Sequence, residues 1–169
     1  EIANYGHFRA YGGDDYTNKA VALFQHLCDE DVEVLFTFNG TGSNIVALGS
    51  LLGPAESVIC SEWAHIHVDE TGAPEHALGI KLQDVPAPDA KVTPEHVHAL
   101  AGAIGNVHHV QPGVVSITQA TELGTLYSIE EIKTLCDVAH SYGMRVHLDG
   151  ARISNATAAL GGDAATFRA

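Results

Sequence analysis

The segment from Val146 to Arg152, Val-His-Leu-Asp-Gly-Ala-Arg, carries the residue types best suited to chemistry. An apolar run leads to Asp149, and Arg152 follows three residues later. At the end of a buried strand in an α/β protein, a carboxylate can point into a cleft, where it protonates and polarises a bound nitrogen heterocycle. The obvious heterocycle of this kind is pyridoxal phosphate. An Asp-Gly pair after a strand is also common in ordinary turns, so both interpretations stay open for this segment alone.

A glycine-containing turn, Gly40-Thr41-Gly42-Ser43, precedes a helix-like segment and is a candidate anion site. Backbone N–H groups at a helix start lack partners, and the helix dipole places partial positive charge there. The turn has neither the lysine of a Walker loop nor the third glycine of a dinucleotide fingerprint. It therefore suits a cofactor with one phosphate, with a purely structural turn as the competing interpretation.

His65 follows a strand-like run and precedes Val68-Asp69-Glu70-Thr71-Gly72-Ala73. A planar imidazole at this position could lie over an aromatic cofactor. The competing interpretation is a polar loop residue whose hydrogen bonds are satisfied locally.

Three closely spaced histidine pairs raise the question of a metal site: His65 and His67, His96 and His98, and His108 and His109. A spacing of two residues puts imidazoles on opposite sides of a helix, and no zinc-protease motif accompanies any pair. We therefore predict no metal site.

The elements that must position these residues alternate between strand-like and helix-like runs. Strands are predicted at 32–38, 57–60, 81–85, 114–118 and 145–148, with helical spacing between several of them. Strands that alternate with helices favour an α/β domain with a mixed, mainly parallel sheet and helices on both faces. No repeat or linker interrupts residues 1–169, so we expect one continuous unit without an internal boundary.

Several helix boundaries are signalled directly. Apolar spacing predicts helices over 16–28 and 45–52, and Thr93-Pro94 marks another helix start. A capping box at Ser128-Ile129-Glu130-Glu131 opens a helix that Tyr142-Gly143 should end.

Composition narrows the functional class. Of 169 residues, 46% are hydrophobic and 17% charged, and 8 Lys and Arg against 21 Asp and Glu give a net charge of −13. This charge repels nucleic acids and anionic membranes, so neither is an expected partner. The dispersed cysteines Cys28, Cys60 and Cys136 form no disulfide or zinc pattern and indicate a reducing cytoplasm. Segment 1–7 has no basic region followed by an apolar run, so we expect no secretory leader there, and the absence of Met leads us to expect an earlier true start.

The motifs together match a family in their order along the chain. They are Asn39-Gly40-Thr41, Ala64-His65-Ile66, Glu70-Thr71-Gly72-Ala73 and the run from His147 to Ile153. In this order they resemble the N-terminal part of the threonine aldolases, in the β-eliminating lyase group of fold-type I pyridoxal-phosphate enzymes. The resemblance covers nearly the whole chain.

The resemblance implies a role for each candidate residue. Gly40 and Thr41 would hold the cofactor phosphate, and His65 would stack on the pyridine ring. Asp149 would pair with the ring nitrogen, and Arg152 would bind the cofactor region or the substrate carboxylate. It further implies a homo-oligomer, a dimer or tetramer, that cleaves a threonine-like β-hydroxy-α-amino acid into glycine and an aldehyde.

Two departures from the family pattern bear on these expectations. The family's Schiff-base lysine lies beyond Ala169, so residues 1–169 alone should not complete the catalytic cycle. Glu122 stands where many threonine aldolases carry a histidine, which leaves the catalytic base unassigned. The alternatives are another fold-type I enzyme, such as an aminotransferase or a β-eliminating lyase, and a non-catalytic fragment.

Overall fold

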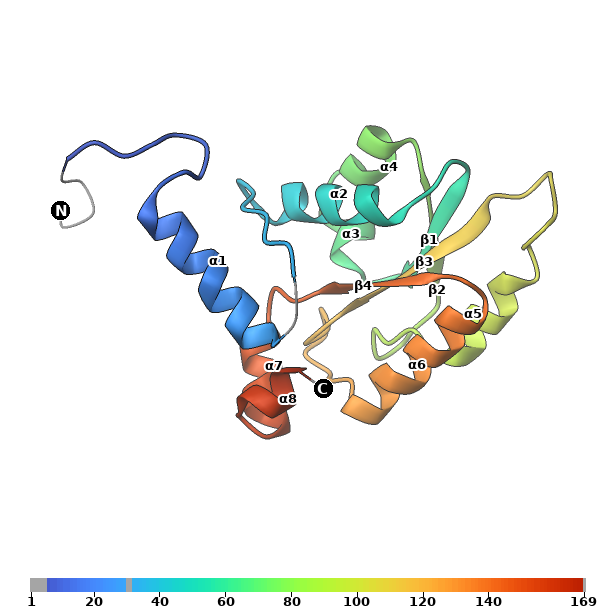
Figure 1. The fold of residues 1–169 in the computed structure, drawn as a ribbon. Helices are drawn as coiled ribbons and strands as arrows, with labels where there is room; N and C mark the ends of the chain where they lie inside the picture. The colour runs from blue at the N-terminus through green and yellow to red at the C-terminus, as the bar shows by residue number, and fades with distance from the viewer. Residues whose placement is uncertain (1–5, 30–31, 169) are drawn as a thin grey trace.

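The computed structural model describes residues 6–29 and 32–168 (Figure 1). Residues 1–5, most of the segment in which we expect no leader, therefore lie outside the described residues. The described helices are α1 (Asp15–Cys28), α2 (Gly40–Leu51), α3 (His65–Val68), α4 (Ala73–Leu78), α5 (Pro94–Ala101), α6 (Ile129–Ser141), α7 (Ile153–Leu160) and α8 (Ala164–Arg168). The described strands are β1 (Glu56–Ser61), β2 (Lys81–Val85), β3 (Gln111–Thr118) and β4 (Arg145–Asp149).

The four strands form one sheet in the order β2-β1-β3-β4, and all three pairings are parallel. In this register Val58 pairs with Leu82 on one side and with Val114 on the other. The predicted mainly parallel α/β sheet is confirmed. Because the strands are parallel, their carboxyl ends meet at one edge, where the ends of β1, β3 and β4 can supply a common site.

Helices cover both faces of the sheet, as predicted. Figure 1 shows α2, α3 and α4 on one face and α5 and α6 on the other. Successive residues of β1 point to opposite faces. Val58 belongs to a buried cluster with Leu48 of α2, whereas Ile59 belongs to a second cluster with Val97 of α5 and Leu135 of α6. Both faces therefore bury apolar surface, which fixes the sheet between two helical layers.

The predicted boundaries of α5 and α6 are confirmed at their capping residues, whereas the helix predicted over 45–52 begins earlier, at Gly40, so that the glycine-containing turn is the first turn of α2. The Ser128 hydroxyl accepts the Glu131 N–H at 3.1 Å, and the Glu131 carboxylate accepts the Ser128 N–H at 2.6 Å. Thr93 is the N-cap of α5, and Tyr142 is the C-cap of α6. Gly143 then adopts a φ of 73°, a left-handed conformation that glycine tolerates without a steric cost.

The strand predicted over 32–38 is wrong. Residues 32–37 have no strand ladder, and the chain bends at Phe38 before α2 begins. Leu35, Phe36 and Phe38 are 64%, 59% and 101% exposed. High β-propensity produces a strand only where a neighbouring strand pairs with the backbone, and none of the four described strands pairs with this segment.

Candidate active site

A cavity of about 600 Å³ opens at the carboxyl end of β4. It brings together all five residues that the sequence singled out, from three separate parts of the chain. Its lining consists of Gly40, Thr41, Ser43, Asn44, Ala47, His65, Glu70, His147, Leu148, Asp149, Gly150, Ala151 and Arg152. The sequence had given no role to two polar members, Asn44 and the buried Glu70.

The N-terminus of α2 forms one wall of the cavity. Asn39 caps this helix, because its Oδ1 accepts the Gly42 N–H at 2.8 Å and its carbonyl accepts the Ser43 N–H at 3.0 Å. The amides of Gly40 and Thr41 come before the first intrahelical bond, so they have no acceptor within the helix. A Cβ added at Gly40 would meet no atom within 4 Å, and the first turn contains no acidic side chain. This wall can therefore bind an anion through its free amides, and no acidic side chain of the first turn repels the anion.

Asp149 ends β4 and is half-buried. Its Oδ1 accepts the Ala151 N–H at 3.0 Å, which orients the carboxylate. Its Oδ2 has only a long contact, 3.5 Å, from the Asn44 amide nitrogen. That oxygen can therefore accept a hydrogen bond from a cationic donor in the cavity.

His65 is the first residue of α3, so it lies at a helix start and not in a loop. The chain turns directly from β1 into this helix, because the Ala64 N–H bonds to the Ser61 carbonyl at 2.9 Å. The His65 imidazole Nδ1 lies 2.9 Å from Glu70 Oε1, and its side chain is 43% exposed. One edge of the ring is thus held while the rest remains accessible.

Arg152 precedes α7 and points its guanidinium toward the loop after β3. Its Nε donates to the Ala120 carbonyl at 2.9 Å, and its Nη2 lies 3.7 Å from Glu122 Oε1. Nη2 is buried and makes no hydrogen bond, so the nearby carboxylate compensates its charge only through a longer ion pair. A further acceptor, such as a ligand carboxylate, would give Nη2 the hydrogen bond that it lacks.

Glu122 joins two of the predicted site residues, a role that the sequence did not reveal. The same Oε1 that approaches Arg152 accepts the backbone N–H of His65 at 3.2 Å. These residues are separated by 57 and 30 positions in the chain. No local pattern could have signalled the contact, because it depends on how β1, β3 and β4 lie side by side.

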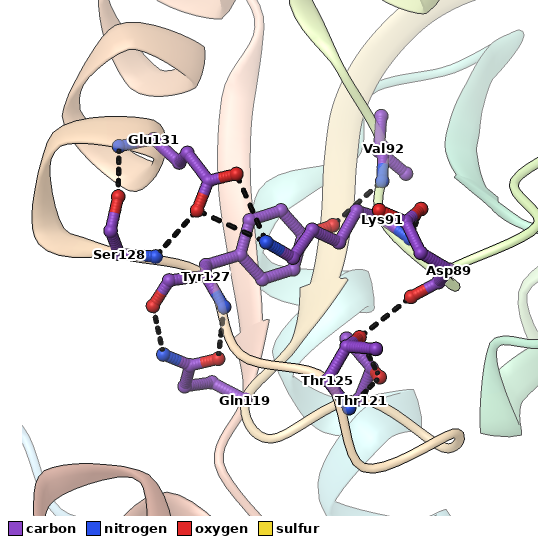
Figure 2. Close-up of polar contacts among 9 residues, drawn as sticks. All are labelled: Asp89, Lys91, Val92, Gln119, Thr121, Thr125, Tyr127, Ser128 and Glu131. Atoms are coloured by element: carbon purple, nitrogen blue, oxygen red, sulfur yellow. Dashed lines mark hydrogen bonds and ion pairs between the residues drawn. The ribbon is translucent and has the colours of Figure 1, made fainter. Parts of the chain in front are cut away.

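A polar network anchors the loop that carries Ala120 and Glu122 (Figure 2). The buried Gln119 side chain donates to the Tyr127 carbonyl at 2.8 Å and accepts the Tyr127 N–H at 3.0 Å. The Tyr127 hydroxyl in turn accepts the Val92 N–H at 2.6 Å. The loop is thereby tied at its base to the connection between β2 and α5, which keeps Glu122 near the cavity.

His147 is a buried histidine of β4 whose Nδ1 lies 2.9 Å from the Ser116 hydroxyl. Burial lowers its pKa below the ordinary value of 6.5, and the Asp149 and Glu70 carboxylates oppose this shift only in part. As pH falls through about 6.5, the unfolded chain takes up a proton that the folded chain resists. The free energy of unfolding should therefore decrease on acidification.

We expect the substitution His147→Asn to reduce this acid sensitivity. Urea unfolding at about pH 8 and about pH 5.5 measures it as the difference in free energy of unfolding. His140→Asn, which changes an exposed histidine of α6, is the matched control and should keep the full difference. An unchanged pH difference in His147→Asn contradicts the assignment.

The histidine pairs occupy separate structural positions. His96 Nδ1 accepts the Thr93 N–H at 3.1 Å, and His98 Nδ1 lies 2.9 Å from the Tyr142 hydroxyl. His67 Nε2 is 3.9 Å from Asp84. Among residues 6–29 and 32–168, no three His, Cys, Asp or Glu side chains are grouped so that they could hold a metal ion.

A family model described as beta-eliminating lyase matches residues 2–168. The chain belongs to the beta-eliminating lyase family. The expected fold, that of the large domain of fold-type I pyridoxal-phosphate enzymes, is thereby confirmed together with the parallel sheet.

Relatives within the beta-eliminating lyase family include low-specificity L-threonine aldolases. That of Pseudomonas sp. (strain NCIMB 10558) is 46% identical over 162 residues, which cover 95% of this chain and 47% of that protein. That of Pseudomonas aeruginosa is 45% identical over 94% of this chain and 46% of that protein. The solved threonine aldolase of Leishmania major has a TM-score of 0.89 at 33% identity, over 93% of this chain and 46% of that one. The chain spans about half the length of the relatives it matches.

Proposed function

We propose that residues 1–169 form one continuous N-terminal part of a pyridoxal-phosphate-dependent threonine aldolase. The complete enzyme would cleave a threonine-like β-hydroxy-α-amino acid into glycine and an aldehyde. The observation that carries this proposal is the convergence of a helix N-terminus, an imidazole and a strand-end carboxylate on one cavity. Identity of 45–46% to low-specificity L-threonine aldolases supports the choice of reaction.

The residues around the cavity fit pyridoxal phosphate. The amides of Gly40 and Thr41 suit a single phosphate, with open space beside Gly40. Asp149 offers an oxygen with only a 3.5 Å contact, which suits a protonated ring nitrogen. The buried Arg152 Nη2, which has no hydrogen bond, suits an anionic oxygen of the cofactor or the substrate.

Each residue of this chain then has a definable task. Bound pyridoxal phosphate supplies an electron sink for the charge that develops at Cα when the Cα–Cβ bond breaks. Asp149 would hold the proton on the ring nitrogen, and His65 would stack on the ring. Arg152 orients the substrate carboxylate through its guanidinium fork.

The covalent attachment to the cofactor must come from elsewhere. None of the lysines Lys19, Lys81, Lys91 and Lys133 lines the cavity. We therefore assign the Schiff-base lysine to a position outside residues 1–169 and infer that these residues alone do not complete the cycle.

The expected setting of the enzyme rests on the family resemblance and on the free cysteines. We infer a homo-oligomer in the cytoplasm that acts on a small amino acid. The free cysteines Cys28, Cys60 and Cys136 support a reducing compartment. Within the part of the chain that the structure describes, no helix is both long and apolar enough to span a bilayer.

The test combines cofactor trapping with product analysis on the complete gene product. After incubation with pyridoxal phosphate and reduction with borohydride, peptide mapping should find one pyridoxyl group, on a lysine outside residues 1–169. Incubation with threonine should yield glycine and an aldehyde. A pyridoxyl group on a lysine within 1–169, or products of amino transfer or ammonia release, contradicts the proposal.

A further inference from the structure

Glu70 is a buried carboxylate in the wall of the cavity. The residue is 3% exposed, and its side chain is fully buried. Its Oε1 receives two polar contacts, and its Oε2 is buried without a hydrogen-bond partner. A buried carboxyl group is unfavourable without hydrogen-bond partners, and the two contacts to Oε1 supply them.

The chain turns sharply after α3, and the turn begins at Glu70, which lines the cavity. Glu70 is followed by Thr71 and Gly72, with φ angles of 53° and 71°, both in the left-handed region. Two such residues in succession turn the chain sharply, and the Ala73 N–H closes the turn on the Glu70 carbonyl at 2.9 Å. The side chain of Glu70 is therefore directed back toward His65, five residues earlier.

The two partners of Glu70 are the groups that determine the geometry of the site. His65 Nδ1 lies 2.9 Å from Oε1, and the Asn44 amide nitrogen donates to the same oxygen at 2.7 Å. The Asn44 amide nitrogen also lies 3.5 Å from Asp149 Oδ2. Since an amide nitrogen carries two hydrogens, Asn44 can direct one to each carboxylate. These contacts bring together three separate segments: α2, the α3–α4 turn and β4.

An ionised carboxylate only accepts hydrogen bonds, so it determines where the His65 proton sits. With Glu70 as acceptor, Nδ1 carries the proton and the neutral ring leaves Nε2 as the acceptor. A hydrogen bond at Nδ1 also sets the plane of the ring. We propose that Glu70 is a positioning residue: it fixes the tautomer and orientation of His65 and, through Asn44, the orientation of Asp149.

The proposal gives a clear expectation for the tautomer in the absence of cofactor. In ¹⁵N-histidine-labelled protein at about pH 9, where imidazoles are neutral, His65 should show a protonated Nδ1. His96 is an internal reference of the opposite kind, because its Nδ1 accepts the Thr93 N–H. Its proton should therefore be on Nε2. Signals are assigned with His65→Asn and His96→Asn.

The substitution Glu70→Leu removes the acceptor of the Nδ1 proton and should abolish the preference of His65 for the Nδ1-protonated form. Glu75→Leu makes the same chemical change at an exposed residue of α4 and should leave the His65 signals unchanged. A protonated Nε2 at His65 in the unaltered protein overturns the proposal without any variant, so the test survives if Glu70→Leu fails to fold. Unchanged His65 signals in folded Glu70→Leu overturn it equally.

A second measurement examines catalysis and rests on the proposed function. With saturating pyridoxal phosphate, Glu70→Leu should lower kcat for threonine cleavage about tenfold, as loss of a supporting hydrogen bond does elsewhere, and leave KM unchanged. Glu75→Leu should alter neither constant. An unchanged kcat in Glu70→Leu overturns the positioning role. If the unaltered protein shows the Nδ1 tautomer but neither binds the cofactor nor cleaves threonine, the proposed function fails and the tautomer assignment stands.

Discussion

Replacing Asp149 with asparagine should lower kcat/KM for threonine cleavage by at least about a hundredfold. The carboxylate is the one acidic group at the end of β4 that lines the cavity with an oxygen available for a ligand. A neutral amide loses the charge that holds a proton on the ring nitrogen, and that proton makes the heterocycle an electron sink. A charge-assisted hydrogen bond contributes up to about 3 kcal/mol, and each 1.36 kcal/mol corresponds to tenfold in rate.

The hydrogen-bond geometry of Asp149→Asn should lower kcat/KM further. An asparagine carbonyl at position 149 can still accept the Ala151 N–H, but its amide group would then face the Asn44 amide, donor against donor. The absorbance spectrum of the bound cofactor and steady-state rates in the complete gene product measure the effect. Asp84→Asn, a half-exposed carboxylate near the end of β2, is the matched control and should retain full activity. Full activity in Asp149→Asn would mean that another group protonates the cofactor.

Replacing Arg152 with lysine should raise KM for threonine about ten- to a hundredfold. The guanidinium bonds to the Ala120 carbonyl through Nε and presents Nη2 beside Glu122, an arrangement that needs a planar fork. A lysine keeps the charge but has a single nitrogen, so it cannot hold both loop groups and a substrate carboxylate. Loss of one or two hydrogen bonds to charged groups accounts for this range.

The opposite end of β4 offers the matched control for this substitution. Arg145 makes an ion pair with Glu56 and donates to the Gly113 carbonyl, far from the cavity lining. Arg145→Lys should reduce the free energy of unfolding and leave KM unchanged. If both variants raise KM equally, the effect of Arg152→Lys reflects general loosening of the strand, and the assignment of Arg152 to the substrate is wrong.

The parts of the fold predicted correctly depend on short-range patterns. The strands at 57–60, 81–85, 114–118 and 145–148 are confirmed, and so is the capping box at Ser128. Each is encoded by residues a few positions apart, through apolar runs or a side chain that caps its own helix. The segment 32–38 is also apolar and β-prone, but no described strand pairs with it. Its local pattern alone was therefore insufficient to predict a strand correctly.

Gly40, Thr41, His65, Asp149 and Arg152 could be selected from the sequence because each lies at the end of an element, where side chains and amides are available for ligands. The sequence by itself determined these candidates and the alternation of strands and helices that carries them. Only the tertiary structure decided that Asn44, Glu70 and Glu122 join them, through contacts that span 26 to 105 residues along the chain. The reason is physical: a buried carboxylate or amide is satisfied by whatever packing brings to it, and packing between α2, the α3–α4 turn and the parallel strands has no local signature.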